Sequence, residues 1–210
     1  MTTKVLCINS SFGSDSISRS LINESVERLT SNNKDIEVTF RDLANQPPDH
    51  LTAEVFALIN GFQKPTDKRQ QHLITETESM LQEFLAAEIV LVGVPMYNLT
   101  VPSTLKAWLD RIMRAGITFR YTETGPQGLA GDKLVVVVAS RGGVYSTGPA
   151  SDLEFQESYL KAAFQFMGVD QVNIVLAEGT SMGPEGKSRA RQLGGQSLDS
   201  VVTELIAAEA

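Results

Sequence analysis

Cysteine and histidine are scarce in this sequence. Its 210 residues contain one cysteine, Cys7, and two histidines, His50 and His72. A lone cysteine excludes an internal disulfide and a multi-cysteine zinc site, so we expect no structural metal. Because neither histidine has a placed serine or aspartate partner, a hydrolase triad is disfavoured, and both histidines are predicted to lie on the surface. Cys7 stands in an apolar run, which predicts an inert thiol in the core.

Long apolar runs and clustered basic residues are missing as well. No stretch reaches the roughly 18 apolar residues of a membrane span, and the N-terminal segment is too short for a signal peptide, so we expect a cytoplasmic protein without a membrane partner. The sequence has 18 Lys+Arg against 25 Asp+Glu, which gives a net charge of −7. This charge repels phosphate backbones and disfavours a nucleic-acid partner. The basic run at residues 187–191 is interpreted as a solvated helix face.

Strand and helix patterns alternate along the chain. Short apolar runs predict strands near residues 5–8, 36–40, 89–94, 134–139 and 172–176. Apolar residues at helical spacing predict helices within residues 17–29, 73–85, 105–113, 159–167 and 198–206. This alternation predicts an α/β fold in one domain over residues 1–210: a flavodoxin-like, doubly wound, five-stranded parallel sheet of order 2-1-3-4-5 with helices on both faces. Residues 43–66 and 115–132 are additional to the strands, helices and connections that this minimal pattern needs.

In such a sheet, ligands bind beyond the carboxyl ends of the strands, where the strand order reverses. The loop after the first predicted strand is rich in serine and opens a helix, as Ser11, Ser16 and Ser18 show. Hydroxyl groups and unpaired N–H groups at a helix N-terminus suit a phosphate dianion, although serine also caps helices without a ligand. The glycine patterns of dinucleotide-binding loops and P-loops are absent.

The loops after the third and fourth predicted strands carry groups suited to a flat ring. Tyr97 and Asn98 combine an aromatic face with an amide that can form hydrogen bonds. Gly142 and Gly143 allow a ligand to approach the backbone closely, or they form a plain tight turn. The neighbouring Arg141 either stabilises negative charge on a ligand or forms an ordinary ion pair, and the adjacent Gly142 and Gly143 favour the ligand role. Flavin mononucleotide (FMN), with a phosphate at one end and a planar ring at the other, matches all three loops.

The same motifs resemble those of the FMN-dependent NADH-azoreductase family, the flavodoxin-like azo and quinone reductases. The resemblance rests on residues 10–11, 16–19, 95–98, 115–123, 140–143 and 177–179, which occur in family order. It implies that the ribityl phosphate is contacted by Ser11, Ser16, Ile17 and Ser18. It further implies that the flavin ring is cradled by Met96, Tyr97, Asn98 and Leu99, and that its pyrimidine end meets Ser140, Arg141, Gly142 and Gly143. Leu99 stands where many relatives have phenylalanine.

The resemblance also implies a reaction. NADH or NADPH would act as a transient donor that gives a hydride to flavin N5, and a quinone or azo compound would then accept the electrons in a second, ping-pong step. No residue need act as acid or base, because the flavin carries the chemistry. The resemblance implies a homodimer. The alternatives are a flavodoxin-type electron carrier and a relative whose flavin site has decayed.

The two added stretches favour an enzyme over a carrier, since a carrier has no need of a walled substrate pocket. Residues 43–66 and 115–132 could supply such walls. Phe119 and Tyr121 in the second stretch either stack on a ring ligand or pack within a hairpin.

Overall fold

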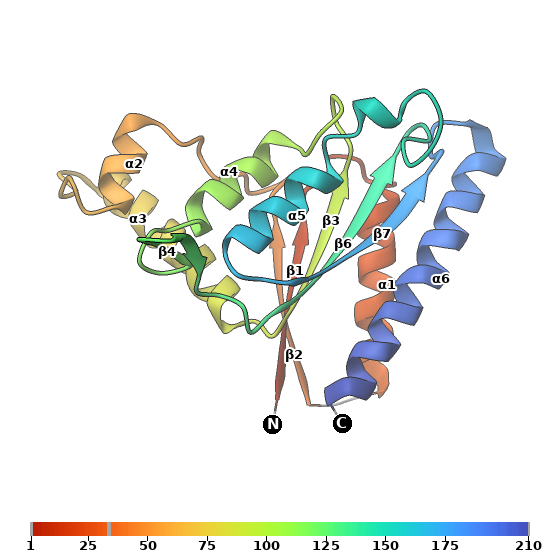
Figure 1. Ribbon diagram of the computed structural model, residues 1–210, viewed down its shortest axis with the longest axis horizontal. Coiled ribbons are helices and arrows are strands. Elements are labelled where there is room, and N and C mark those ends of the chain that lie inside the picture. Colours follow the sequence, from red (N-terminus) through yellow and green to blue (C-terminus); the bar gives the residue numbers. More distant parts are fainter. Residues whose placement is uncertain (1, 33–34, 210) are drawn as a thin grey trace.

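Five parallel strands form the central sheet of the computed structural model, which describes residues 2–32 and 35–209 (Figure 1). In spatial order they are β2 (Ile36–Asp42), β1 (Thr3–Asn9), β3 (Ile89–Pro95), β6 (Leu134–Arg141) and β7 (Gln171–Glu178). Each neighbouring pair is parallel. Numbered among themselves, these strands have the order 2-1-3-4-5, and the predicted doubly wound sheet is confirmed.

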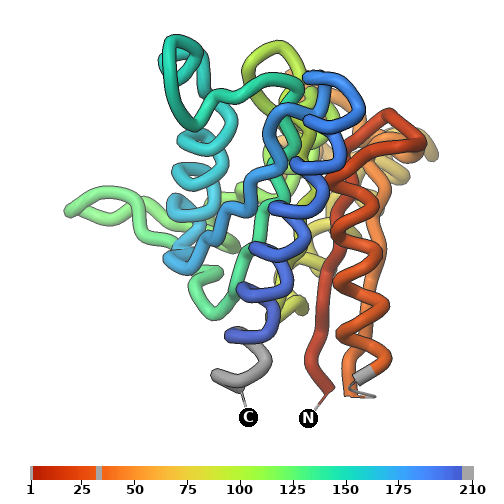
Figure 2. The backbone as a smooth tube through the Cα atoms, turned by 90° about the vertical axis from the view of Figure 1, so that its right-hand side faces the viewer, coloured from red at the N-terminus to blue at the C-terminus, as the bar shows by residue number. Residues whose placement is uncertain are grey.

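Helices cover both faces of the sheet (Figures 1 and 2). One face carries α1 (Ile17–Asn32) and α6 (Gly183–Glu209), and the other carries α3 (Lys68–Ala86), α4 (Ser103–Ile112) and α5 (Glu157–Phe166). All five helices predicted from apolar spacing are present. In the last of them, the side chains of Leu205 and Ile206 lie outside the described residues.

The burial of the strands explains the patterns in the sequence. Along β1, Leu6 and Ile8 pack toward the α3, α4 and α5 face, whereas Val5 and Cys7 pack toward α1 and α6. Strands β3 and β6 are buried at every position, as expected of parallel strands covered on both faces. Strand β2 lies at the sheet edge and alternates between partly buried and exposed residues at its start.

The first added stretch contains α2 (Ala53–Ile59), which the sequence did not reveal as a helix. Thr52 caps it by accepting a hydrogen bond from the N–H of Val55. Its apolar residues form a small separate cluster with Leu73 of α3. The buried Arg111 of α4 donates to the carbonyl of Asp49 at 2.9 Å. This bond fixes the segment that leads into α2.

The second added stretch is an antiparallel hairpin of β4 (Phe119–Thr122) and β5 (Gly125–Gly128) that projects from the body of the protein (Figure 2). The ring of Phe119 lies 4.6 Å from that of Phe166 and 5.5 Å from that of Tyr121, centroid to centroid. Of the two roles considered for Phe119, the structure shows hairpin packing. Tyr121 is 74% exposed.

None of the helices in the described part of the chain combines the length and the apolar character that crossing a membrane requires.

Candidate functional site

The loops after β1, β3 and β6 meet at the carboxyl edge of the sheet, around a cavity of about 240 Å³. Residues from all three loops line it, joined by two from beyond β7: Ser11, Gly13, Asp15, Ser16, Ile17, Pro95, Tyr97, Ser140, Thr180 and Lys187. The sequence therefore predicted correctly that these loops converge. It did not single out Thr180, and it interpreted Lys187 as part of a solvated helix face rather than as a residue of the cavity.

The loop between β1 and α1 is held in place by its own side chains. The hydroxyl of Ser10 donates to the carbonyl of Gly93 at 2.8 Å, and Arg19 donates to the carbonyl of Ser11 at 2.8 Å. Ser16 caps α1, since its Oγ accepts from the N–H of Arg19, and Ser18 lies fully buried with its Oγ 3.2 Å from that of Ser16. The first N–H groups of α1 have no carbonyl partner within the helix, and groups of this kind can bind an anion.

A tight turn follows β3, and it places two residues in the left-handed region of the backbone. The N–H groups and carbonyls of Tyr97 and Thr100 bond to each other at 3.0 and 3.2 Å. Between them, Asn98 has φ 48° and Leu99 has φ 72°. Asparagine tolerates this region, but leucine pays roughly 1–2 kcal/mol for it. Such strain is typical of functional sites, because there the backbone must present its polar groups in a fixed direction.

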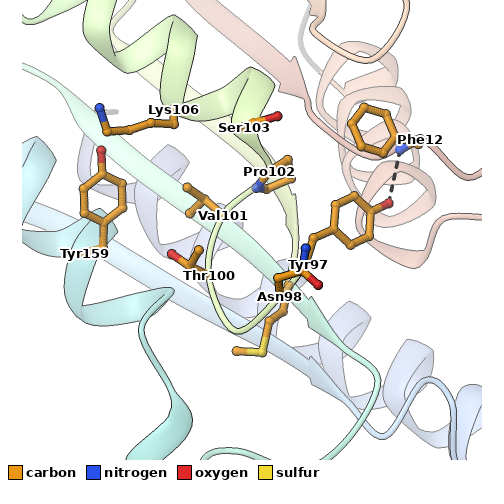
Figure 3. A pocket seen from close by; sticks show the side chains of 10 residues that line it. Phe12, Tyr97, Asn98, Thr100, Val101, Pro102, Ser103, Lys106 and Tyr159 are labelled. Atoms are coloured by element: carbon orange, nitrogen blue, oxygen red, sulfur yellow. Dashed lines mark hydrogen bonds between the residues drawn. The ribbon is translucent and has the colours of Figure 1, made fainter. Parts of the chain in front are cut away.

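A larger pocket of about 800 Å³ lies beside this turn (Figure 3). It extends from Phe12 and Tyr97 at one end to Lys106 and Tyr159 at the other, over a floor of Thr100, Val101, Pro102 and Ser103. Burial, together with the nearby Asp110 carboxylate, raises the pKa of Tyr159 to about 12. Its hydroxyl therefore stays protonated at neutral pH. The pocket has the size of a site for a small aromatic molecule.

The loop after β6 is tied to the loop after β7. Thr180 and Ser181 donate backbone hydrogen bonds to the carbonyls of Arg141 and Gly142, each at 3.0 Å. A Cβ on Gly142 would lie only 2.9 Å from the Oγ of Ser181. A side chain at Gly142 would therefore displace the Ser181 hydroxyl, a contact that the sequence alone did not reveal.

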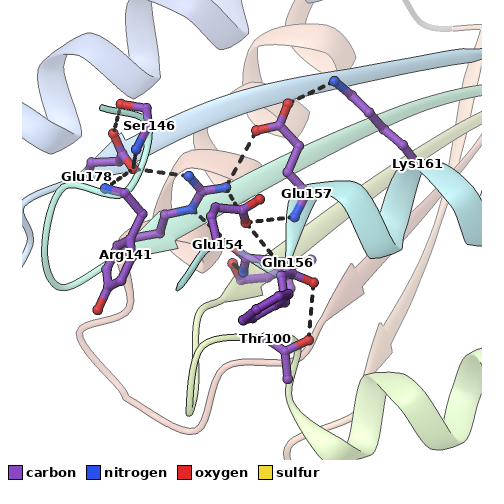
Figure 4. A network of polar contacts seen from close by, with 11 residues as sticks. Thr100, Arg141, Ser146, Glu154, Gln156, Glu157, Lys161 and Glu178 are labelled. Atoms are coloured by element: carbon purple, nitrogen blue, oxygen red, sulfur yellow. Dashed lines mark hydrogen bonds and ion pairs between the residues drawn. The ribbon is translucent and has the colours of Figure 1, made fainter. Parts of the chain in front are cut away.

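Arg141 is fully buried, and its guanidinium is the centre of an ionic network (Figure 4). It contacts Glu154 at 2.9 Å and Glu178 at 3.0 Å, and it donates to Gln156 at 3.1 Å. Glu157 is a further carboxylate at 3.6 Å. Of the two roles that the sequence left open for this side chain, the structure shows the ion pair.

The carboxylates of this network position two loops near the site. Glu154 accepts from the N–H groups of Gln156 and Glu157 at 2.8 Å each, at the start of α5. Glu178 accepts from the N–H groups of Tyr145 and Ser146 at 2.8 and 3.0 Å. Burial alone would raise the pKa of Glu178, but the hydrogen bonds from Ser146, Tyr145 and Arg141 outweigh it, and the pKa lies below its ordinary value.

A family model described as "Flavodoxin-like fold" matches residues 3–201. The chain belongs to this flavodoxin-like family. A relative from Azospirillum brasilense, named FMN-dependent NADH:quinone oxidoreductase, is 45% identical over 207 residues, which cover 97% of this chain and 100% of that protein.

Solved structures of the flavodoxin-like family agree with the fold. An azoreductase from Bacillus anthracis str. Sterne has a TM-score of 0.86 at 27% identity and covers 96% of this chain and 99% of its own. An FMN-dependent NADH-azoreductase from Bacillus anthracis str. Ames Ancestor, solved in complex with FMN, has a TM-score of 0.84 at 28% identity and covers 97% of this chain and 99% of its own.

Within this flavodoxin-like architecture, the predicted site residues fall into three groups. The cavity is lined by Ser11, Ser16, Ile17, Tyr97 and Ser140, and the larger pocket by Met96, Tyr97 and Asn98. Ser18, Leu99, Arg141, Gly142 and Gly143 belong to the same loops but line neither space. Phe12, Lys106 and Tyr159 line the pocket and were missed, because only the folded chain brings their separate segments together.

Cys7, His50 and His72 lie apart from the two spaces. Burial raises the pKa of Cys7 to about 12, and both histidines are exposed. Among residues 2–32 and 35–209, no three His, Cys, Asp or Glu side chains gather as a metal site would require. In the described part of the chain, no residue of 43–66 or 115–132 lines the cavity or the pocket, so the walls expected from these stretches are not formed within this single chain.

Proposed function

We propose that this chain is an FMN-dependent oxidoreductase that uses NADH or NADPH to reduce quinones and azo compounds. The observation that carries the proposal is the 45% identity, over 97% of this chain and all of the relative, to a protein named FMN-dependent NADH:quinone oxidoreductase. The loops that match the family motifs also converge on one edge of the sheet, which supports the same conclusion independently.

The cavity residues fit the phosphate end of FMN. A phosphate dianion would be held by the N–H groups at the start of α1 and by the hydroxyls of Ser11 and Ser16. The buried Ser18 would act beneath them by orienting the Ser16 hydroxyl. The donor set contains hydroxyls and N–H groups with no metal-binding cluster, which is the chemistry expected for a phosphate. Ile17 would contribute its backbone N–H as the first residue of the helix.

The isoalloxazine ring would lie against the turn of Met96, Tyr97, Asn98 and Leu99. The left-handed conformations of Asn98 and Leu99 fix the backbone groups of this turn before any ligand arrives, so little ordering entropy remains to be lost on binding. Ser140, Gly142 and Gly143 would bond the polar edge of the ring through their backbone. Arg141 would contribute its backbone and would position the surrounding loops through its ion pairs.

When bound, FMN supplies the redox chemistry by taking a hydride at N5 from the nicotinamide and returning two electrons to the acceptor. A quinone needs one NADH, which supplies a hydride, and one further proton to become a hydroquinone. An azo bond needs four electrons, hence two NADH, to give two amines. The protein orients donor and acceptor, and because the flavin carries the redox chemistry no side chain need act as an acid or base.

The pocket of about 800 Å³ is the proposed place for both donor and acceptor. Donor and acceptor would both bind in this one pocket beside the Tyr97 turn, so they would bind one after the other. This supports a ping-pong order. The lining of this pocket is mixed. The aromatic rings of Phe12 and Tyr97 lie at one end, and the polar tips of Lys106 and Tyr159 lie at the other. Such a lining suits a flat ring with oxygen substituents.

We also propose that the protein acts as a homodimer. The hairpin exposes 74% of Tyr121, and the residues Leu129 and Ile117 beside it are 41 and 37% exposed. Exposed apolar groups that lie together are typical of an interface. Placement in the cytoplasm stays a prediction.

Steady-state turnover tests the proposed function. The protein with added FMN should oxidise NADH in the presence of menadione without any protein partner, and should decolorise an azo dye more slowly. Omission of FMN should remove both activities. A flavodoxin-type carrier, the second candidate, would bind FMN yet show no NADH oxidation until a partner reductase is added, and that result would overturn the proposal.

A further inference from the structure

Lys187 joins the last helix to the loop that opens the first one. Its Nζ lies 2.6 Å from the Oδ2 of Asp15, 172 residues away in the sequence. Helices α1 and α6 run side by side on one face of the sheet, which brings their N-terminal ends together (Figure 2). Lys187 lines the cavity at the start of α1 and also the wider cleft of about 660 Å³ between the two helices.

Three cations border that cleft, and two of them are held by other groups. Arg19 is bonded to the carbonyl of Ser11 and lies 3.5 Å from Asp42. Arg191 is bonded to Ser20 and Glu24. Among the described residues, Lys187 bonds only to Asp15.

The pair of Lys187 and Asp15 is open to water. The Asp15 side chain is 80% exposed and that of Lys187 is 46% exposed. Lys187 holds the pKa of Asp15 below its ordinary value, first by its hydrogen bond and then by its charge. A carboxylate that is so well hydrated loses little when its partner turns away, because a surface ion pair contributes only a small free energy.

The charges around the cavity favour an anion that carries more negative charge than the carboxylate of Asp15. The first turn of α1 carries no acidic residue, which leaves Asp15, just before the helix, as the acidic group in the cavity lining. A phosphate dianion in the cavity would carry twice the charge of Asp15 and could be reached by the flexible lysine stem.

We propose that Lys187 is a phosphate-binding residue of the flavin site, and that Asp15 competes with the phosphate for its ammonium group. This inference rests on the proposed function, because it takes the anion to be the phosphate monoester of FMN. The pair then sets the selectivity of the site for a phosphorylated flavin over a flavin without phosphate.

Flavin binding to the apoprotein tests this inference without any turnover. The dissociation constants of FMN and of riboflavin are measured by fluorescence titration at low and high salt. Lys187→Met should weaken FMN binding by roughly tenfold to a hundredfold, the range for a lost charge-assisted hydrogen bond, and should leave riboflavin binding unchanged. Asp15→Asn should tighten FMN binding by about fivefold, since one nearby like charge is removed. High salt should shrink both effects.

Arg191→Met is the matched control, because Arg191 lies one turn further along α6 and borders the cleft without lining the cavity. It should change FMN affinity by less than about twofold, the size of effect left by a screened surface charge. If the unaltered protein binds FMN and Lys187→Met binds it equally well, the inference is wrong while the proposed function stands. If the unaltered protein does not bind FMN, the proposed function fails and the inference fails with it.

Discussion

The backbone N–H of Phe12 donates to the hydroxyl of Tyr97 at 3.3 Å, and the two rings stack at 5.3 Å with an angle of 15° between their planes (Figure 3). Phe12 belongs to the loop after β1, and Tyr97 to the turn after β3. This contact therefore ties the proposed phosphate site directly to the proposed ring site.

The stacking predicts a measurable coupling between these residues. In a double-mutant cycle of Phe12→Leu and Tyr97→Leu, we expect a coupling free energy of about 0.5–1.5 kcal/mol in urea unfolding, toward the low end because Phe12 is 57% exposed. Tyr97→Phe serves as the control: it keeps the stack, and the freed N–H of Phe12 meets water. Additive single mutants would show that the rings touch without stabilising each other.

Loss of Arg141 should destabilise the protein severely. Arg141→Met leaves the carboxylates of Glu154 and Glu178 partly buried without their cation, and breaking such a pair costs about 3–5 kcal/mol. Urea unfolding of the apoprotein measures this cost. Arg120→Met is the control, because Arg120 is exposed and, within residues 2–32 and 35–209, its side chain bonds only to Gln127. It should change the free energy of unfolding by less than about 0.5 kcal/mol. Equal effects of the two substitutions would contradict the network.

Docking of the hairpin depends on Gly128. A Cβ at this position would lie 2.0 Å from the backbone nitrogen of Gly168, which itself has φ +93°. Gly128→Ala should therefore separate the hairpin from the end of α5 and open residues 115–132 to limited proteolysis. Glu123→Ala, at an exposed position of the same hairpin, should leave the cleavage pattern unchanged. Equal protease resistance of Gly128→Ala and the unaltered protein would contradict this packing.

The pKa of Cys7 predicts a loss of stability at high pH. In the unfolded chain the thiol ionises near its ordinary value of 9.0, whereas burial raises the pKa in the folded protein to about 12. Between these values the folded state binds more protons than the unfolded state, so its stability falls as pH rises, by up to about 1.4 kcal/mol per pH unit. Cys7→Ala should remove that contribution to the slope in urea unfolding.

Thiol alkylation checks the same burial at lower pH. Native protein should react with iodoacetamide at pH 8–9 far more slowly than protein in urea, because the buried thiol is both covered and protonated. Rapid alkylation of the native protein would contradict the position of Cys7 in the core between the sheet and α1.

The strands and long helices were predictable because their patterns are local. The buried runs of β3 and β6 follow from cover on both faces, and the five-stranded order follows from the alternation of strands and helices. Helix α2 escaped prediction because seven residues show too few turns of apolar spacing, and because its apolar side chains pack in their own cluster beside α3.

The candidate site was predictable as loops but not as contacts. Sheet topology alone brings together the loops that contain Ser11, Tyr97 and Ser140. The partners of Arg141 lie 13 to 37 residues away, and Lys187 meets Asp15 across 172 residues. Such pairings depend on where each helix packs, which a local sequence pattern does not encode.

Anaerobic mixing of the FMN-loaded protein with its substrates tests the central proposal most directly. One equivalent of NADH should bleach the yellow flavin band, and menadione added afterwards should restore it in full without any other protein. A flavin band that NADH leaves unchanged, or that menadione fails to restore, would contradict the assignment of this chain as a quinone reductase.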